Sequence, residues 1–296
     1  MSIAAITMVW DDNWFLDRWI GYFERHIGRQ NLFIVLHGED AEARRIAQGC
    51  NILLLPRETV DLDFDWTRWR FLTDLTNALT GYFDTVLCLD VDELIVPVQE
   101  EQSLAECLLA LDGTSARSVA GYELFPDQPG AERYDAGQGI AAQCRKGLFS
   151  PFYSKSCIAK GPVAFTPGAH GTFTAPAPLA ETVALFHLRF VSTVELERRR
   201  SARKAIATAA YDAANVNVAD MIASGRLVSW KRAGRRHGKV FREFDTATEM
   251  AFAEGHAACV AQLAGLRYEN DGQFLYRTDG YAPTRLRLPD WMQAMF

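Results

Sequence analysis

Three acidic side chains lie within four residues, at Asp90, Asp92 and Glu93, directly after the apolar run 85–89. Carboxylates this close together at the end of a buried strand repel each other unless a cation compensates them. Oxygen ligands suit Mg²⁺ or Mn²⁺, which keep several waters and share their remaining coordination with substrate phosphates. In an extended Asp-x-Asp segment the two side chains share one face. The motif therefore predicts a divalent cation held by this trio, and a solvated acidic turn is the alternative.

The elements before this motif alternate between strand and helix. Apolar runs with strand character occur at residues 3–10, 31–36, 52–55 and 85–89, and helical patterns lie between them at 13–28, 40–48 and 69–81. Strands separated by helices in this order indicate right-handed crossovers and a mostly parallel sheet. Ligands bind such sheets beyond the carboxyl ends of the strands, which is where the acidic motif lies.

The pattern changes after residue 116. Strands are expected at 118–125 and 183–190, and the Gly- and Pro-rich stretch between them predicts loops and short antiparallel strands. Ser192-x-x-Glu195 and Thr246-x-x-Glu249 have the spacing of capping boxes, so each should open a long helix. A turn is expected around 229–238. The prediction is therefore an α/β domain over residues 1–190, with a mostly parallel mixed sheet flanked by helices, and a helical C-terminal extension over 191–296.

The composition excludes several classes of protein. A chain of 296 residues that is 49% hydrophobic can bury a sizeable core, and an aromatic share of 11% argues against disorder. The net charge of −6 argues against a protein that coats nucleic acid. The six cysteines form no Cys-x-x-Cys pair, and the N-terminus has no basic leader. These features predict reduced thiols and a cytoplasmic protein.

Several segments resemble a bacterial glycosyltransferase of the family 2 type, which has a GT-A (Rossmann-type) fold. In the first hundred residues they are Thr7–Ile20, Asn31–Val35 and Leu89–Ile95. Later segments that resemble the family are Lys155–Ile158, Gly168–Gly171 and Phe186–Arg189. The resemblance covers about residues 1–205. The sequence departs from the family at Asp11-Asp12, where an Asn-Glu or similar pair is usual.

The resemblance implies a nucleotide-sugar donor, in the first place a UDP-sugar, and Mn²⁺ or Mg²⁺ held by the Asp-x-Asp. It makes Asp92 the direct metal ligand and gives Asp90 a water-mediated or ribose contact. Glu93 is then either a carboxylate behind the ligands or a structural residue. His187 or His170 would supply a further ligand, unless they are ordinary hydrogen-bonded histidines. The donor contacts that we expect are Val9, Asp11, Asp12, Asp40, Arg68, Asp90, Lys155 and Arg189.

Transfer of a sugar develops negative charge on a diphosphate leaving group, which a cation and basic side chains stabilise. If attack on the sugar is direct, the acceptor hydroxyl needs a general base. Glu123, near the end of the 118–125 strand, is the candidate, with Asp127 behind it. The alternative is that Glu123 is a surface residue of the strand.

The basic residues are concentrated in the second half of the chain. Residues 1–100 hold eight Arg and no Lys against seventeen acidic residues, whereas 189–242 hold thirteen basic residues against four acidic ones. This asymmetry is consistent with a basic segment that meets an anionic substrate. The runs Arg198–Lys204 and Lys231–Lys239 are read first as solvated surface and second as peripheral contact with the inner membrane. Diphosphate binding is a further possibility for these runs, although Lys155 and Arg189 are better placed for it, and nucleic acid ranks a distant third. Trp66 and Arg68 are candidates for the edge of the donor or acceptor cleft, with helix packing as the alternative.

The function predicted from these features is metal-dependent transfer of a hexosyl group from a nucleotide-sugar to a hydroxyl acceptor. The acceptor would be a glycan or a lipid-linked sugar in polysaccharide or glycoconjugate synthesis. One alternative is a sugar-phosphate nucleotidyltransferase, although the Gly-rich loop usual after the first strand of that class is absent at 10–14. The other is a nucleotide- or glycan-binding module without chemistry.

Overall fold

The computed structural model of the chain describes residues 2–57, 61, 63–113, 116–127, 139–214 and 238–296. Its centre is an eleven-stranded sheet with the main order β10-β13-β7-β6-β8-β4-β1-β2-β3, to which β5 and β9 add through β6. The N-terminal part of this sheet is parallel. Its strands are β1 (Ile3–Val9), β2 (Leu32–His37), β3 (Asn51–Leu55) and β4 (Thr85–Cys88).

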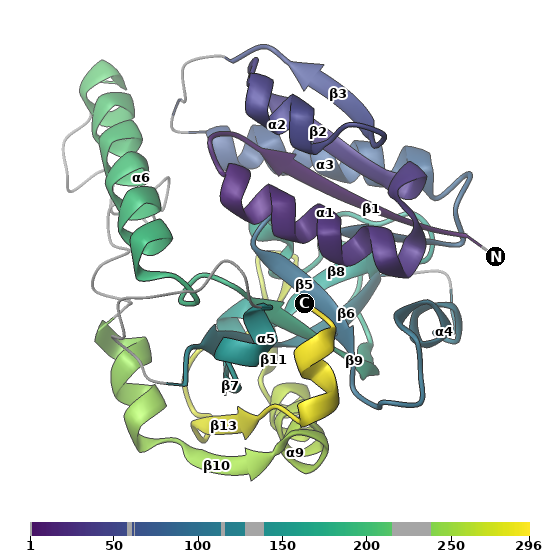
Figure 1. Cartoon of the computed structure of the whole chain (residues 1–296), viewed down its shortest axis with the longest axis vertical. Helices are drawn as coiled ribbons and strands as arrows, with labels where there is room; N and C mark the ends of the chain where they lie inside the picture. Colours follow the sequence, from purple (N-terminus) through teal and green to yellow (C-terminus); the bar gives the residue numbers. More distant parts are fainter. Residues whose placement is uncertain (1, 58–60, 62, 114–115, 128–138, 215–237) are drawn as a thin grey trace.

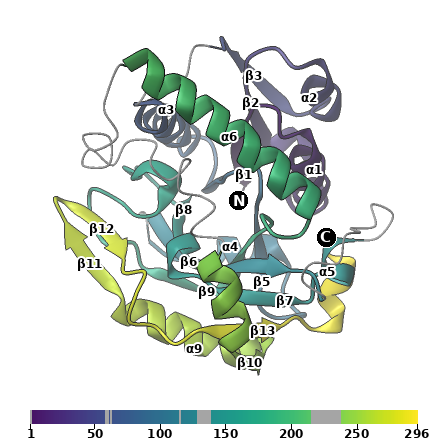
Figure 2. The same cartoon turned by 90° about the vertical axis from the view of Figure 1, so that its left-hand side faces the viewer.

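Helices cover both sides of these parallel strands. The connecting helices are α1 (Asn13–Ile27), α2 (Ala41–Ile46) and α3 (Phe64–Leu79). The helices α1 and α3 lie on opposite sides of β1 (Figures 1 and 2). Phe15, Trp19 and Phe23 of α1 are buried, as their spacing of four residues predicts. The structure therefore confirms the predicted α/β fold with a central sheet flanked by helices.

The second part of the sheet is mixed. Its strands are β5 (Glu93–Pro97), β6 (Ala116–Phe125), β7 (Lys146–Phe149), β8 (Lys155–Ala159) and β9 (Leu179–His187). The strand β6 runs antiparallel to β7 and β8 and parallel to β9, and β9 runs antiparallel to β5. The sequence did not predict β5, because its first residue is the charged Glu93 and the preceding acidic residues indicate a turn.

The C-terminal third holds more strand than the sequence predicts. After α6 (Thr193–Ala214) and a helix over 238–246 come β10 (Thr248–Ala251), α9 (Phe252–Gly265), β11 (Arg267–Asn270), β12 (Gln273–Tyr276) and β13 (Thr284–Arg287). The capping role of Ser192 is confirmed, since its Oγ accepts from the Glu195 amide at 3.3 Å. The capping box predicted at Thr246 is wrong, because its hydroxyl donates to the Arg242 carbonyl at the end of a helix. The turn predicted at 229–238 falls almost wholly outside the described residues.

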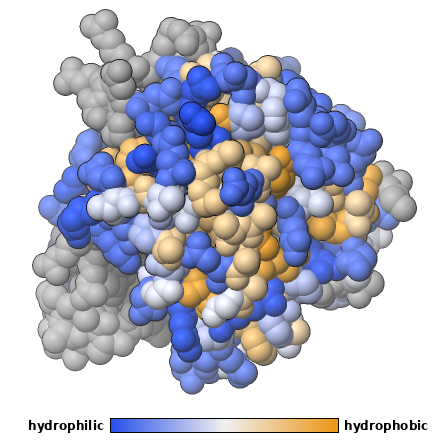
Figure 3. All heavy atoms as spheres, turned by 90° about the horizontal axis from the view of Figure 1, so that it is seen from below, coloured by the Kyte–Doolittle hydropathy of each residue, from blue (hydrophilic) through white to orange (hydrophobic). Residues whose placement is uncertain are grey.

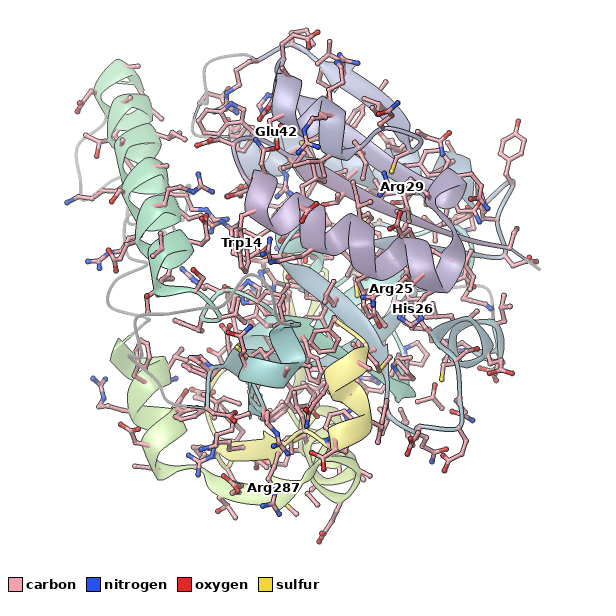
Figure 4. The ribbon with its side chains drawn as sticks, in the orientation of Figure 1. Trp14, Arg25, His26, Arg29, Glu42 and Arg287 are labelled. Atoms are coloured by element: carbon pink, nitrogen blue, oxygen red, sulfur yellow. The ribbon has the colours of Figure 1, made fainter. Side chains whose placement is uncertain are left out.

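The end of the chain returns to the first helix. The 3-10 helix η4 (Asp290–Ala294) leads to Met295, whose carbonyl accepts a hydrogen bond of 2.6 Å from Arg25. Arg25 lies near the C-terminal end of α1 (Figure 4). Tyr22 of the same helix contacts the Phe296 ring edge-on and donates to the Ile95 carbonyl at 2.8 Å. These contacts join α1 to both β5 and the C-terminus.

The outer surfaces carry two further observations. Seen from below, on the side where β10 and α9 lie in Figure 1, apolar residues gather near the centre and hydrophilic residues surround them (Figure 3). Apolar atoms are common on the surfaces of folded proteins. Among the described residues, no helix combines the length and the apolar character needed to cross a bilayer.

His256 links α9 to the sheet. Its Nε2–H donates to the Glu181 carbonyl at 3.1 Å, and its Nδ1 therefore accepts from the Tyr122 hydroxyl at 2.9 Å. Burial lowers the pKa of His256 to about 4, although the bond to Glu181 raises it. The folded protein thus keeps this imidazole neutral at a pH where the unfolded chain protonates it.

We expect this difference to weaken the fold in mild acid. Between pH 7.5 and 5 the unfolded chain takes up a proton at His256, so the free energy of unfolding should fall by about 2 kcal/mol more in the wild type than in His256→Gln. Urea unfolding of both proteins at the two pH values measures this difference. Identical pH dependence of the two proteins would contradict a neutral, buried His256.

Candidate functional site

An open pocket of about 110 Å³ lies beside the carboxyl ends of β1 and β4. Residues at the end of β1, after β4, on α3 and on α6 line it. Figure 2 shows α6 crossing in front of β1 and its flanking helices. This edge of an open α/β sheet is the usual place for a ligand. Five arginines and three aspartates line the pocket: Arg57, Arg68, Arg198, Arg199, Arg203, Asp11, Asp12 and Asp90.

The turn after β1 is held by α6. Asp11 has a left-handed backbone with φ +52°, which Asp tolerates better than most residues. Arg198 donates to Asp11 at 3.0 Å and to Asp12 at 2.8 Å. Arg199 forms a second ion pair with Asp12, at 3.1 Å. Two guanidinium groups on one turn of α6 therefore fix the acidic pair that follows β1. Figure 4 shows Trp14, two residues later, at the end of α1 that is nearest to α6.

Asp90 and Glu93 share a buried lysine. The Lys155 ammonium lies 2.9 Å from Asp90 Oδ2 and 2.5 Å from Glu93 Oε1. Arg68 donates to the other oxygen of Asp90 at 2.6 Å. The Lys155 side chain is 1% exposed and the Glu93 side chain 0%. Two of the three carboxylates in the acidic motif are thus compensated by basic side chains of the chain itself.

Asp92 begins a second buried network. Its Oδ2 accepts from Arg199 and lies 3.0 Å from His187 Nε2, while His187 Nδ1 lies 2.7 Å from Glu123 Oε2. The register of the sheet produces this line, because His187 is opposite Glu93 on β5 and opposite Glu123 on β6. The Tyr153 ring stacks on His187 with centroids 3.9 Å apart. Glu123, Asp92 and His187 are all buried.

These pairings set the protonation states. Burial disfavours the charged form of Asp92, but Arg199 and His187 outweigh it and hold its pKa well below the usual value. Burial also opposes charge on His187, yet Glu123, Tyr153 and Asp92 raise its pKa well above 6.5. The imidazolium then donates to a carboxylate from each nitrogen. For Glu93 burial dominates and raises its pKa to about 7, against the effect of Lys155.

The residues present fit a divalent cation only in part. No group of three or more His, Cys, Asp or Glu side chains is arranged to hold a metal ion within the described part of the chain. Asp90 and Glu93 do not fit, because Lys155 and Arg68 already compensate them. Asp92 and His187 do fit in chemistry. Asp92 Oδ2 and His187 Nε2 face each other. The other ring nitrogen, Nδ1, is hydrogen-bonded to the Glu123 carboxylate, as is usual for metal-bound histidines.

Binding a cation at this pair has a cost. The ion would replace the proton on His187 Nε2, and it would compete with Arg199 for the Asp92 oxygen. Magnesium-type sites often use one or two side chains and complete their coordination with water and substrate phosphates. The five metal ligands expected from the sequence therefore reduce to two candidates in the structure.

The other end of the pocket is aromatic. Arg57 lies over the Trp10 ring, 3.6 Å from its centroid, and donates to His37 Nδ1 at 2.9 Å. The His37 ring stacks on Phe64 with centroids 5.4 Å apart. Flat rings and a guanidinium plane at one end, with further arginines at the other, suit a ligand that has a planar group linked to an anionic one.

The pocket collects most of the donor contacts expected from the sequence. Five of them line it: Val9, Asp11, Asp12, Arg68 and Asp90. Lys155 lies behind Asp90, as described above. Arg189 lies farther along the chain, just after β9, and donates to the Tyr153 hydroxyl at 2.9 Å.

Three expected residues have other contacts. Asp40 caps α2, where its Oδ1 accepts from the Ala43 amide at 2.9 Å. Asp127 follows β6 and accepts from the Arg145 amide at 2.8 Å. His170 follows the 3-10 helix η3 (Pro167–Ala169), and its ring lies 4.3 Å from Phe152. The His170 ring also lies edge-on to Tyr153, with centroids 6.2 Å apart, and Tyr153 stacks on His187.

Several pocket residues were missed at the sequence level. Arg199 and Arg203 were read as solvated or membrane-facing, yet Arg199 is 7% exposed and both line the pocket. Their spacing of four residues on a helix places them on one face, and this signal was available. Arg198 and Arg200 of the same run are also paired, with Asp11 and Glu197. The contact of this run with a membrane stays a prediction. Most of the second run, 231–237, lies outside the described residues.

The sequence matches no family model and no curated protein. Parts of the structure match solved structures at low similarity. A crystal structure of 4-diphosphocytidyl-2C-methyl-D-erythritol synthase has 17% identity and a TM-score of 0.30, over 47% of this chain and 66% of that one. A mannose-1-phosphate geranyltransferase from Thermus thermophilus has 13% identity and a TM-score of 0.28, over 76% of this chain and 68% of that one.

A third structure is a glycosyltransferase involved in the glycosylation of the major capsid of PBCV-1. It has 13% identity and a TM-score of 0.23, over 45% of this chain and 55% of that chain. The chain therefore spans just under two thirds of the first structure and about half of the third. At these TM-scores the similarities assign neither a family nor an activity.

The shared lysine gives a test of the buried network. We expect Lys155→Met to lower the free energy of unfolding by about 3 kcal/mol, because Asp90 and Glu93 lose a buried partner. The double variant Lys155→Met/Glu93→Gln removes one of the stranded charges and should recover part of this loss. Urea unfolding at pH 8 measures both.

The matched control is Arg200→Met, which breaks an exposed pair with Glu197. Its free energy of unfolding should change by less than about 0.5 kcal/mol. Equal losses in the single and the double lysine variants would contradict the proposed charge compensation.

Proposed function

We propose that this chain is a transferase that takes its group from a nucleoside-diphosphate-linked donor. The specific proposal is transfer of a hexosyl group from a nucleotide-sugar, in the first place a UDP-sugar, to a hydroxyl acceptor. A glycan or lipid-linked acceptor in polysaccharide or glycoconjugate synthesis fits this chemistry. One observation supports the proposal above the others: five arginines line a single pocket beside the carboxyl ends of the parallel strands.

The two ends of the pocket suit the two ends of such a donor. Trp10, His37 and Phe64 offer flat surfaces for a nucleobase. Asp11 and Asp12 can accept hydrogen bonds from ribose hydroxyls. The arginines of α6 then face the diphosphate. A guanidinium group binds phosphate oxygens through two parallel hydrogen bonds, which a lysine cannot match.

The same arginines would assist the chemical step. When the bond between sugar and phosphate breaks, negative charge grows on the diphosphate. Donors that are already oriented stabilise this charge without having to reorganise. Asp12 and Asp92 orient Arg199 from two sides, so its position is fixed before a ligand arrives. Arg203, one turn later, is half-buried, and desolvation together with Arg199 lowers the pKa of Arg203.

A divalent cation is part of the proposal. Asp92 and His187 would hold Mn²⁺ or Mg²⁺, and the ion would supply further positive charge to the diphosphate. Glu123 contacts Nδ1 of His187 and is 1% exposed. We therefore propose that Glu123 orients the imidazole, which differs from the role of general base expected from the sequence.

A sugar-phosphate nucleotidyltransferase is the second candidate. The five arginines are as suitable for a triphosphate as for a diphosphate, and this observation favours neither reaction. Two products separate the candidates. A panel of nucleotide-sugars, with and without chelator, tests for released nucleoside diphosphate. A panel of nucleoside triphosphates with sugar 1-phosphates tests for released pyrophosphate. Release of pyrophosphate alone would replace the first proposal by the second, and nucleotide binding without any turnover would indicate a binding module.

Arg203 provides a test of the diphosphate end. We expect Arg203→Met to weaken UDP binding at least tenfold, since a charge-assisted hydrogen bond contributes roughly 1.5–3 kcal/mol. Isothermal titration with UDP in the presence of chelator measures this effect without a metal contribution. Arg200→Met, on the same helix but paired with Glu197, is the control and should bind UDP normally. If Arg203→Met binds UDP as tightly as the wild type, the diphosphate does not bind beside Arg203.

The cation requires separate variants. We expect Asp92→Ala to abolish any effect of Mn²⁺ on UDP affinity, and His187→Ala to weaken that effect more than His170→Ala does. Mn²⁺ binding followed by electron paramagnetic resonance gives a readout that does not depend on turnover. A larger effect of His170→Ala than of His187→Ala would make His170, and not His187, the metal ligand. Full Mn²⁺ dependence in Asp92→Ala would refute the assignment of Asp92 as a ligand.

A further inference from the structure

A second groove lies on the other side of α3 from the pocket. Residues of α3 and of the segment 163–173 line it. At 100° per residue, Arg68 points away from the face that carries Trp66, Arg70 and Thr73. One helix therefore presents Phe64 and Arg68 to the charged pocket, and Trp66, Arg70 and Thr73 to this groove.

Two exposed aromatic rings stand side by side at the groove. Trp66 is 48% exposed and Phe173 is 37% exposed. Their ring centroids are 6.0 Å apart and their planes differ by 34°. Both rings are partly exposed. Packing in the core therefore does not account for a large aromatic residue at either position. A pair of accessible flat faces is a surface on which another flat, partly apolar molecule can rest.

Polar groups accompany these rings. Arg70 and Asp74 line the same groove and are exposed. Neither forms a hydrogen bond or an ion pair with another residue that the structure describes. Thr73 is only 9% exposed, and its hydroxyl has no hydrogen-bond partner among the described residues. This oxygen is itself closed to solvent, so the polar groups that a ligand in the groove can reach are those of Arg70 and Asp74.

The walls of the groove are fixed in place. The Asn77 side chain donates to the Val163 carbonyl at 2.9 Å and accepts from the Val163 amide at 2.8 Å. The Phe173 amide donates to the Ala164 carbonyl at 2.8 Å. Gly171 allows this segment to approach β12 closely, because a Cβ there would lie 2.0 Å from the Phe274 carbonyl oxygen. A site that is already formed loses less entropy when it binds a ligand.

The groove is next to the charged pocket. The Trp69 ring is 2% exposed and lines the groove. Lys155 Nζ lies 5.9 Å from the centroid of this ring, and the Arg68 guanidinium carbon lies 5.4 Å from it. The thickness of one indole ring thus separates the groove from the groups that compensate Asp90. A chain molecule lying in the groove would have one end near the carboxylate network.

We propose that this groove binds a carbohydrate chain, as the part of the hydroxyl acceptor that lies away from the reacting sugar; this proposal rests on the proposed function. A pyranose has an apolar face, which suits Trp66 and Phe173, and a rim of hydroxyls, which suits Arg70 and Asp74. A lipid chain would require a lining without these polar groups. The pairing of open aromatic faces with unsatisfied polar side chains selects a sugar.

The first experiment measures binding without nucleotide. The full chain is applied, in chelator, to an array of oligosaccharides that covers neutral hexose, N-acetylhexosamine, deoxyhexose and uronic acid chains. Affinities for the oligosaccharides that bind are then determined by isothermal titration. We expect Trp66→Ala and Phe173→Ala each to weaken binding at least tenfold, and Asp74→Ala to weaken it several-fold. The matched control is Tyr82→Ala, which removes an aromatic side chain that is 85% exposed elsewhere on the surface and should change nothing.

The outcomes separate this proposal from the proposed function. Failure of the wild type to bind any oligosaccharide, or normal binding by Trp66→Ala and Phe173→Ala, would overturn the groove assignment. The melting temperatures of these two variants, followed by circular dichroism, should match that of the wild type, so that a loss of binding is not a loss of fold. Release of nucleoside diphosphate by the wild type is measured independently. If the wild type binds oligosaccharides but releases no nucleoside diphosphate, the groove assignment stands and the proposed transferase function is refuted. If it releases nucleoside diphosphate but binds no oligosaccharide, the proposed function stands and the groove assignment is refuted.

Discussion

The fold depends on the compensation of buried carboxylates. Asp92 cannot be buried at the end of the sheet as a lone anion, because the loss of hydration would exceed any packing gain. Arg199 and His187 compensate it, and each comes from an element that follows it by about one hundred residues. This single pairing therefore fixes α6 against the carboxyl edge of the sheet. The placement of α6 in turn closes one wall of the pocket and directs Arg203 into it.

The same compensation changes how an acidic motif should be interpreted. Three carboxylates after a strand predict a cation, and in the structure the cations beside them are basic side chains. Lys155 serves Asp90 and Glu93 together. A lysine with a side chain 1% exposed that lies 2.5 Å from a carboxylate leaves little room for a metal ion at that oxygen. Of the three carboxylates, Asp92 is the one with a described neighbour, His187, whose chemistry also suits a metal.

The sequence predicts what local patterns determine. The alternation of apolar runs and helical faces gives the parallel half of the sheet, and the position of Asp90 after β4 predicts the edge at which the pocket lies. Long-range register is not encoded locally. Nothing near Glu123 indicates that it is opposite His187, and β5 begins with a charged residue that becomes favourable only when Lys155 on β8 compensates it. Tertiary pairing of this kind overrides local preference.

The basic run on α6 is the segment whose role was interpreted wrongly from the sequence. A run such as Arg198–Arg200 is indistinguishable by composition from a solvated surface, and most such runs are solvated. The difference lies in the faces: Arg200 pairs with Glu197 in solvent, while Arg199 and Arg203, four residues apart, point to the pocket. A helix that follows the last core strand must cross the sheet edge, so its inward face meets whatever ligand that edge binds. Reading basic runs face by face separates the pair Arg199 and Arg203 from the pair Arg200 and Lys204, and the structure decides which pair points to the pocket.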